Sequence, residues 1–183
     1  GAGPAGLAFS TTAAQRGHQV TLFDAAAEIG GQFNVAKRIP GKEEFYETLR
    51  YFGKQIELTG VELKLNTPVT AEMLNSSDFD EIVLATGITP RTPELEGVDH
   101  AKALTYLDVM NGAEVGQKVA VIGAGGIGFD ISEVLVHQGE STSQNIPAFM
   151  KEWGVDMSMA SRGGVENMQQ EFEPAAREVY LLQ

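Results

Sequence analysis

The sequence contains no cysteine among its 183 residues. Disulfide bonds, thiolate chemistry and a cysteine-held iron–sulfur cluster are therefore excluded within these residues. Histidine is also scarce, and His18, His100 and His137 are isolated from one another. No Ser/His/Asp set and no cluster with metal-ligand spacing is present, so we expect neither a catalytic residue nor a metal site in this chain.

Basic residues are few: 13 Lys and Arg stand against 25 Asp and Glu, which gives a net charge of −12. This balance disfavours nucleic acid or an anionic membrane surface as a partner. A bound phosphate must then be held by backbone dipoles and one or two placed cations. The sequence also lacks the roughly 20-residue apolar run of a membrane span and the start of a signal peptide. We expect a cytoplasmic protein.

Glycine, in contrast, is frequent and clustered. The first six residues read Gly-Ala-Gly-Pro-Ala-Gly, a G-x-G-x-x-G fingerprint. Gly1 would make a tight turn, Gly3 would let the backbone approach a pyrophosphate, and Gly6 would let a helix pack closely on its sheet. Pro4 and Ala5, between the glycines, are further candidate cofactor-binding residues, and the N-terminus of the helix expected from Leu7 attracts phosphate. The fingerprint needs a strand before it, so we expect this sequence to be a piece of a longer protein.

An acid follows at the distance that a ribose-binding residue requires. Residues 19–23 predict a strand ending at Asp24, 18 positions after Gly6, and about 20 are expected. A carboxylate there accepts hydrogen bonds from the adenosine ribose and repels a 2′-phosphate, which suits FAD or NAD better than NADP. The alternative is that Asp24 only caps the following turn. Gly31 and Gln32 come next, where backbone and a side-chain amide can approach the same cofactor.

A basic cluster interrupts the acidic sequence. Lys37, Arg38 and Lys42 lie in a loop before the next helix, and a cation there can neutralise a pyrophosphate. The alternative for each is a solvated basic turn.

Two later segments complete the predicted first nucleotide site. Val69 opens an extended stretch whose backbone can read an adenine edge. Residues 80–85 predict a buried strand that leads into Thr86 and Gly87, where we expect the chain to close over the cofactor.

A second copy of the fingerprint predicts another nucleotide site. Its candidate binding residues are Gly123, Gly125, Gly126, Ile127 and Gly128. A fully buried strand is expected at 118–122 before this copy, and a helix is expected at 127–137 after it. Residues 179–182 predict the next strand, so the residue that would choose between NADP and NAD is expected just beyond Gln183.

The pattern as a whole predicts an α/β protein. Residues 1–112 are expected to form a Rossmann-like FAD-binding domain that lacks its first strand and C-terminal segment. Residues 113–183 are expected to form the N-terminal half of an inserted Rossmann-like NADPH-binding domain. Within it, 140–178 reads as a polar insertion without obvious chemistry, with Trp153 as a packing anchor. Further expected elements are helices at 7–16, 43–59, 103–110 and 147–153, a strand at 61–65, and a linker at 88–100.

Several segments resemble the bacterial NADPH-dependent 2,4-dienoyl-CoA reductases, an iron–sulfur flavoenzyme family related to trimethylamine dehydrogenase. The stretches 139–146 (Gly-Glu-Ser-Thr-Ser-Gln-Asn-Ile) and 152–154 (Glu-Trp-Gly) carry the resemblance more specifically than any glycine motif does. The other segments that carry it are 1–6, 23–24, 29–34, 39–45, 85–87 and 125–130.

The resemblance implies a modular oxidoreductase of unsaturated fatty acid β-oxidation. In such an enzyme electrons pass from NADPH to FAD, through a 4Fe-4S cluster to FMN, and on to a 2,4-dienoyl-CoA bound to a barrel domain. The barrel and the cluster would lie outside these 183 residues. The resemblance also implies FAD contacts, and it favours Lys42 over its basic neighbours. The implied contacts are Ala5, Asp24, Gln32, Lys42 and Val69.

Two other functions stay open at this point. In a trimethylamine dehydrogenase-like protein the first site would hold a nucleotide without a redox role, and the chain would be a non-catalytic nucleotide-binding module. Another NAD(P)H–flavin reductase, such as a glutamate synthase small subunit, is the second, although the stretch 139–154 speaks against it.

Overall fold

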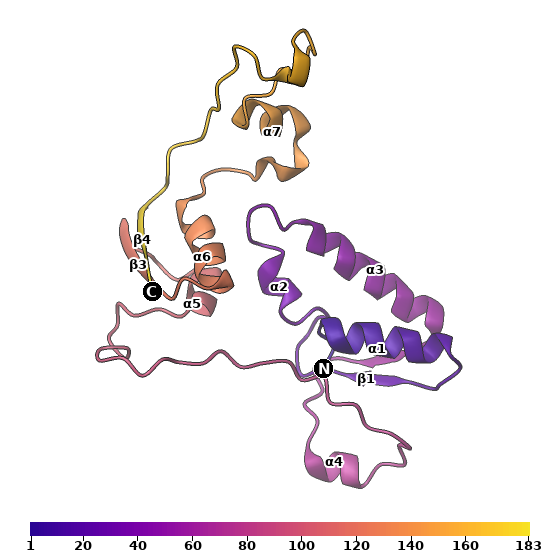
Figure 1. The fold of residues 1–183 in the computed structure, drawn as a ribbon. Coiled ribbons are helices and arrows are strands. Elements are labelled where there is room, and N and C mark those ends of the chain that lie inside the picture. Colours follow the sequence, from indigo (N-terminus) through magenta and orange to yellow (C-terminus); the bar gives the residue numbers. More distant parts are fainter. The chain divides into compact units, whose positions relative to one another are not determined.

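A computed structural model describes residues 1–183, and the chain divides into two compact units (Figure 1). Unit 1 comprises Gly1–Lys37 and Glu44–Val98, and unit 2 comprises Arg38–Glu43 and Asp99–Gln183. The division after Val98 falls within the predicted linker. The domain boundary that the sequence places at residue 112 stays a prediction.

Unit 1 is built around a parallel strand pair. Its elements are α1 (Pro4–Gln15), β1 (Thr21–Phe23), α2 (Phe33–Ala36), α3 (Glu44–Thr59), β2 (Glu62–Lys64) and α4 (Ala71–Asn75). β1 and β2 are parallel and in register, with Leu22 opposite Leu63. Because α3 is the crossover between them, and α1 packs beside α3 (Figure 1), the unit has the βαβ arrangement of a Rossmann-like fold.

Helix α1 begins at Pro4, three residues before the predicted start at Leu7. Gly3 is its N-cap in an extended conformation, and proline suits the first helical position because its φ is already helical and its missing N–H has no intrahelical partner there. The helix ends at the C-cap Arg16, and Gly17 follows with a φ of 96°. Gly17 thus lies one residue past the C-cap, where glycine adopts the left-handed conformation without strain.

The core of unit 1 joins the fingerprint to α3. Apolar residues of α3 recur every three or four positions, which places them on the face that packs on the core. The buried core residues are Ala2, Leu7, Leu22, Ile56 and Val61, with Leu49, Phe52 and Leu63 packed against them. Burying side chains of this size stabilises the unit by about 1.5–3 kcal/mol each.

The outer glycines of the first fingerprint are packed against each other. A Cβ added at Gly6 would lie 1.8 Å from the carbonyl oxygen of Gly1 and 3.5 Å from Cδ1 of Leu22 in β1. No side chain fits at Gly6 unless the turn or the helix moves. This contact fixes the position of the start of α1 relative to the turn at Gly1 and to β1.

Unit 2 repeats this arrangement. Its elements are α5 (Tyr106–Met110), β3 (Lys118–Ile122), α6 (Gly126–Val136), the 3₁₀ helices η1 (Thr142–Gln144) and η2 (Arg162–Gly164), α7 (Ile146–Glu152) and β4 (Glu178–Leu182). β3 and β4 pair in parallel over their full lengths. A Cβ added at Gly128 would lie 1.8 Å from the carbonyl oxygen of Gly123 and 3.4 Å from Cδ1 of Leu181. The two fingerprints therefore share one packing geometry.

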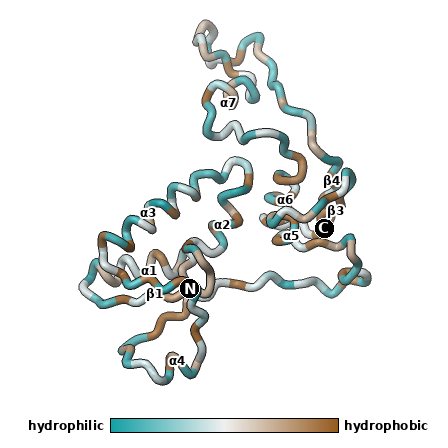
Figure 2. The backbone as a smooth tube through the Cα atoms, turned by 180° about the vertical axis from the view of Figure 1, so that it is seen from behind, coloured by the Kyte–Doolittle hydropathy of each residue, from teal (hydrophilic) through white to brown (hydrophobic).

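The predicted buried strand at residues 80–85 is wrong. This stretch is extended without a strand partner, and its apolar side chains are exposed, Leu84 at 77%. Within unit 1 the sheet consists of β1 and β2 alone, so nothing pairs with the stretch. The stretch 80–85 approaches the fingerprint at Ala85: a Cβ added at Gly1 would lie 2.3 Å from the carbonyl oxygen of Ala85. Figure 2 shows the hydrophobic colour along the chain that returns here from α4.

The prediction that strand 118–122 is fully buried is also wrong. Side chains of β3 alternate between half-buried and exposed, and Ile122 is 69% exposed. The reason is that α6 covers one face of the two-stranded sheet. The helix predicted from residue 103 begins only at Tyr106, because Thr105 and Asp108 form a capping box that sets its start.

The insertion at 140–178 contains α7, close to the helix predicted at 147–153. Gly154, with a φ of 68°, lies against the backbone of Gln169, where an added Cβ would come within 2.8 Å. The ring of Trp153 packs edge-on against Phe172 at 5.7 Å and lies 6.1 Å from Phe149. Trp153 thus joins two parts of the insertion, as predicted for a packing anchor, although it remains 48% exposed.

The interlocked glycines predict a specific stability effect. Gly6→Ala is expected to lower the free energy of unfolding by about 1–3 kcal/mol, because the new methyl group cannot fit beside the Gly1 carbonyl. Gly53→Ala is the matched control: Gly53 lies inside α3, and an added Cβ would make an ordinary contact at 3.8 Å. That change is expected to stabilise by about 0.5–1 kcal/mol. Urea unfolding followed by circular dichroism measures both, and equal stabilities of the two variants would contradict the packing argument.

Candidate functional site

A cavity of about 470 Å³ lies at the N-terminus of α1 in unit 1. The structure brings together here most of the residues predicted for the first nucleotide site. They are Gly1, Gly3, Pro4, Ala5, Asp24, Gly31, Gln32, Thr86 and Gly87. Leu84, Ala85 and Ile88 complete the lining. These three were missed as site residues, although their position directly next to the predicted Thr86 and Gly87 or one residue further away was a usable signal.

Asp24 holds the fingerprint turn by its carboxylate. One oxygen accepts a hydrogen bond from the N–H of Ala2 at 2.5 Å, and the other accepts one from the N–H of Ala26 at 2.8 Å. The carbonyl of Ala2 accepts from the N–H of Gly30 at 2.8 Å. Asp24 therefore caps the following turn, which was the alternative interpretation, and it also lines the cavity. The two roles are compatible, because each carboxylate oxygen has a second lone pair.

Gly3 and Gly31 line the cavity at the point where two segments of the backbone approach each other. Gly31 has a φ of 51°, and a Cβ there would lie 3.0 Å from Cα of Gly3. At Gly3 itself an added Cβ would meet only Cα of Gly31 at 3.9 Å. The middle glycine of the fingerprint thus faces open space, whereas the outer glycines are packed.

The N-terminal end of α1 contributes a positive partial charge to the cavity, whose lining also holds the carboxylate of Asp24. The first N–H groups of a helix have no intrahelical partners and carry the positive end of its dipole. The first turn of α1 contains no acidic residue that would oppose this field. The arrangement suits a phosphate group, as predicted from the fingerprint.

The second fingerprint in unit 2 has matching geometry. Gly123 has a φ of 110°, and its N–H donates to the carbonyl of Leu182 at 2.7 Å. Gly125 is the N-cap of α6, with φ −90° and ψ −176°, close to the φ −77° and ψ −176° of Gly3. An added Cβ at Gly125 or Gly126 would meet nothing within 4 Å. Ile127 follows in the first turn of α6 and is half exposed.

Two predicted FAD contacts do not line the cavity of unit 1. Val69 lies in the segment between β2 and α4 and is not among the lining residues. Lys42 belongs to unit 2, where its ammonium lies 2.7 Å from both carboxylate oxygens of Asp130. The contacts of both residues with FAD stay predictions.

Glu43, next to Lys42, is also held within unit 2. Its carboxylate accepts a hydrogen bond from the hydroxyl of Ser143 at 2.6 Å. Burial acts to raise the pKa of Glu43, but the hydrogen bonds from Ser143 and Ser141 outweigh it, so the pKa lies below its ordinary value.

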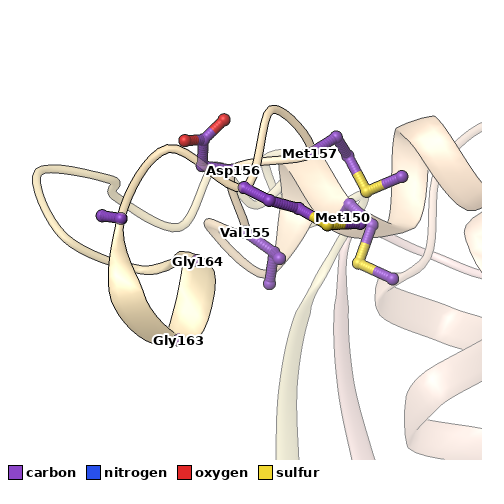
Figure 3. Close-up of a pocket in the computed structure, with 8 residues that line it drawn as sticks. Met150, Val155, Asp156, Met157, Gly163 and Gly164 are labelled. Atoms are coloured by element: carbon purple, nitrogen blue, oxygen red, sulfur yellow. The ribbon is translucent and has the colours of Figure 1, made fainter.

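A second hollow, of about 490 Å³, lies in the insertion of unit 2. Its lining is mainly apolar, and Figure 3 shows Met150 and Met157 together on one side of it. The carboxylate of Asp156 points away from them and accepts hydrogen bonds from Ser158. Nothing in this lining provides acid–base or metal chemistry, and no group of His, Asp and Glu side chains in the structure is gathered around a metal position. None of the helices is both long and apolar enough to cross a bilayer.

Comparison with known proteins agrees with this geometry. The family described as pyridine nucleotide-disulphide oxidoreductase matches residues 1–169. A metal reductase of Desulforamulus reducens is 32% identical over 155 residues, which cover 82% of this chain and 23% of that protein. An NADH oxidase of Thermoanaerobacter brockii is 30% identical over 167 residues, covering 88% of this chain and 25% of the relative. The chain spans about a quarter of the length of these curated relatives.

A solved structure is similar over the whole chain. It is a 2-naphthoyl-CoA reductase in complex with 2-naphthoyl-CoA, with a TM-score of 0.70 and 27% identity. The similarity covers 100% of this chain and 32% of that one. Together with the family match, it shows that the fold is the predicted Rossmann-like FAD- and NAD(P)-binding fold.

The position of Asp24 predicts a measurable binding effect. If its carboxylate holds the adenosine ribose, Asp24→Asn should weaken FAD retention by at most a few kcal/mol, the strength of charged hydrogen bonds. Glu28→Gln is the control, because it removes an exposed acid from the same loop without touching the cavity. FAD content after gel filtration and dialysis of the full-length protein measures the effect. Unchanged FAD content in the Asp24 variant would leave Asp24 only its turn-capping role.

Proposed function

Because this chain belongs to the pyridine nucleotide-disulphide oxidoreductase family, we propose that it is the electron-entry module of a flavin-dependent reductase. In this proposal unit 1 binds FAD, the second fingerprint binds NADPH, and hydride passes from the nicotinamide to the flavin. Family membership implies binding of FAD and NAD(P)H. The chemistry of hydride transfer comes from the cofactors, and the protein supplies binding and orientation.

One observation carries the proposal: the cavity at the N-terminus of α1. Its volume of about 470 Å³ lies in the range of small-molecule sites. Its lining combines an open middle glycine, a helix N-terminus and a carboxylate, which match a pyrophosphate and a ribose. Among residues predicted from the sequence, Gly3 and Ala5 would face the pyrophosphate, and Asp24 the ribose.

The remaining lining residues would support the same cofactor. Gln32 can donate a hydrogen bond from its amide, and Gly31 leaves its backbone accessible. Thr86 and Gly87, which end the stretch beside Gly1, would close over the cofactor from the other side. Their neighbours Leu84 and Ile88 are exposed apolar residues of the lining, suited to contact with an uncharged part of a cofactor.

For the full-length protein we propose reduction of a 2,4-dienoyl-CoA, with a 4Fe-4S cluster and FMN outside this chain carrying the electrons onward. The segments 139–146 and 152–154 support it, as does the likeness to a reductase that binds 2-naphthoyl-CoA. The relatives named a metal reductase and an NADH oxidase share the same module. The acceptor would therefore be set by the part of each protein that lies beyond the module.

The substrate class is tested by incubating full-length protein with NADPH and a 2,4-dienoyl-CoA under anaerobic conditions. We expect stoichiometric NADPH consumption and an enoyl-CoA product, measured by chromatography. Flavin reduction by NADPH without any enoyl-CoA would contradict the substrate and leave the electron-entry module standing. A visible spectrum with the flavin bands of FMN alone would instead favour the non-catalytic nucleotide module.

Gly125 tests the second fingerprint without disturbing the protein's own packing. Valine fits there, because an added Cβ meets nothing within 4 Å and the backbone is extended, but its side chain would stand in the path of a pyrophosphate. Gly125→Val is expected to lower NADPH oxidation at least about a hundredfold, which corresponds to about 2.8 kcal/mol of lost binding, and to leave FAD bound.

The control is Gly116→Val, in the same unit and equally open, for which we expect normal rates. Normal reduction of FAD by NADPH in the Gly125 variant would show that the second fingerprint is only structural.

A further inference from the structure

Methionine is concentrated in the insertion of unit 2. Four of the six methionines of the chain lie between residues 150 and 168. Three of these line the apolar hollow: Met150 comes from α7, and Met157 and Met159 come from the loop 155–164 that follows (Figure 3). Thioether side chains are flexible and polarisable, so they fill irregular apolar space. Three of the four apolar side chains in this lining are therefore thioethers, the fourth being Val155.

The two methionines of the loop are accessible to solvent, unlike the methionine that ends α5. Met157 and Met159 are 52% and 82% exposed, whereas Met110 is 8% exposed. A small oxidant in solution therefore reaches the loop methionines more readily than Met110. Because the chain has no cysteine, thioethers are its only sulfur groups, and they are open to oxidation.

We propose that Met157 and Met159 form a modification site for hydrogen peroxide. A lone pair of the thioether sulfur attacks one oxygen of the peroxide, the O–O bond breaks, and that oxygen stays on the sulfur. The leaving hydroxide takes up the proton of the transferred oxygen and becomes water, so the sulfur loses two electrons and the peroxide gains them. The product is methionine sulfoxide, which is polar where the thioether was apolar. This inference goes beyond the proposed function and does not depend on it.

Backbone hydrogen bonds fix the loop that carries the two methionines. The N–H of Val155 donates to the carbonyl of Met150 at 2.7 Å, and the N–H of Asp156 donates to the carbonyl of Gly164 at 2.6 Å. The second bond closes the loop, and both oxidisable residues lie inside it. A sulfoxide oxygen needs a hydrogen-bond donor, because a polar group in apolar surroundings without one is unfavourable. Oxidation is therefore expected to draw both side chains from the hollow into water, which removes apolar packing and loosens the loop.

The simpler alternative is oxidation that leaves the structure unchanged, as at any exposed methionine that supports no packing. Met73 provides the comparison within the same molecule. It is 37% exposed, lies in α4 and lines neither of the two cavities. The proposal therefore makes two separate claims: the loop methionines react before buried Met110, and their oxidation, unlike that of Met73, opens the loop.

The first claim is tested by the order of oxidation in the full-length protein. The protein is treated with hydrogen peroxide and digested, and the sulfoxide at each methionine is quantified by mass spectrometry. Because reaction requires access to the sulfur, sulfoxide is expected at Met157 and Met159 about fivefold faster than at Met110. Oxidation of Met110 at the same rate as these two residues would overturn the proposed site.

The second claim is tested by trypsin cleavage after Arg162, an exposed residue of the same loop. Cleavage of a native protein follows the population of the locally open form, so its rate is expected to rise on the order of fivefold after peroxide treatment. Methionine sulfoxide reductases restore the thioether and should return the rate to its starting value. Cleavage after exposed Lys102, outside the insertion, is the internal reference.

Leucine variants separate methionine oxidation from other effects of peroxide. Met157→Leu combined with Met159→Leu keeps apolar side chains of similar volume but has no sulfur to oxidise. Peroxide is expected to leave cleavage after Arg162 unchanged in this double variant. Met73→Leu is the matched control and should respond as the wild type does. A response that persists in the double variant would overturn the inference, as would complete oxidation of both wild-type residues without faster cleavage.

Discussion

The close approach of the first and third fingerprint glycines is the constraint on which both units depend. In each unit the carbonyl oxygen of the first glycine occupies the place where a side chain of the third would be. This contact brings the helix down onto the turn, and it lets a leucine of the adjacent strand, Leu22 or Leu181, pack against the same glycine. The helix N-terminus is thereby aimed at the space above the turn. The cavity of unit 1 is a consequence of this packing.

The glycines of each fingerprint therefore have different physical duties. Gly6 and Gly128 are required by the protein's own backbone, whereas Gly3 and Gly125 leave room that the protein does not fill. The fingerprint already predicts close packing at the third glycine and a pyrophosphate approach at the middle one. The structure separates those that maintain the fold from those that keep a space accessible.

Sequence reasoning predicted most of the residues that line the cavity of unit 1, because these residues follow local rules. Glycines at a fixed spacing precede a helix, an acid ends the next strand, and Thr86-Gly87 follows an apolar stretch; the structure brings these parts to one cavity. Sequence reasoning failed where the structure depends on pairing between segments that are far apart in the sequence. Residues 80–85 have the composition of a buried strand, but an apolar stretch becomes a strand only beside a hydrogen-bonded neighbour. Lys42 was judged by its charge and loop, and nothing local reveals that its partner is Asp130, 88 residues later.

The division of the chain into units has a practical consequence for dissecting the protein. The backbone passes from one unit to the other after Lys37, again after Glu43 and a third time after Val98. Truncating the chain after Val98 would therefore separate unit 2 from its own residues 38–43 and leave Asp130 without its counter-ion. Residues 1–98 made alone would carry the loop 38–43 without its binding partners. No single cut in the sequence therefore produces both units with all of their residues.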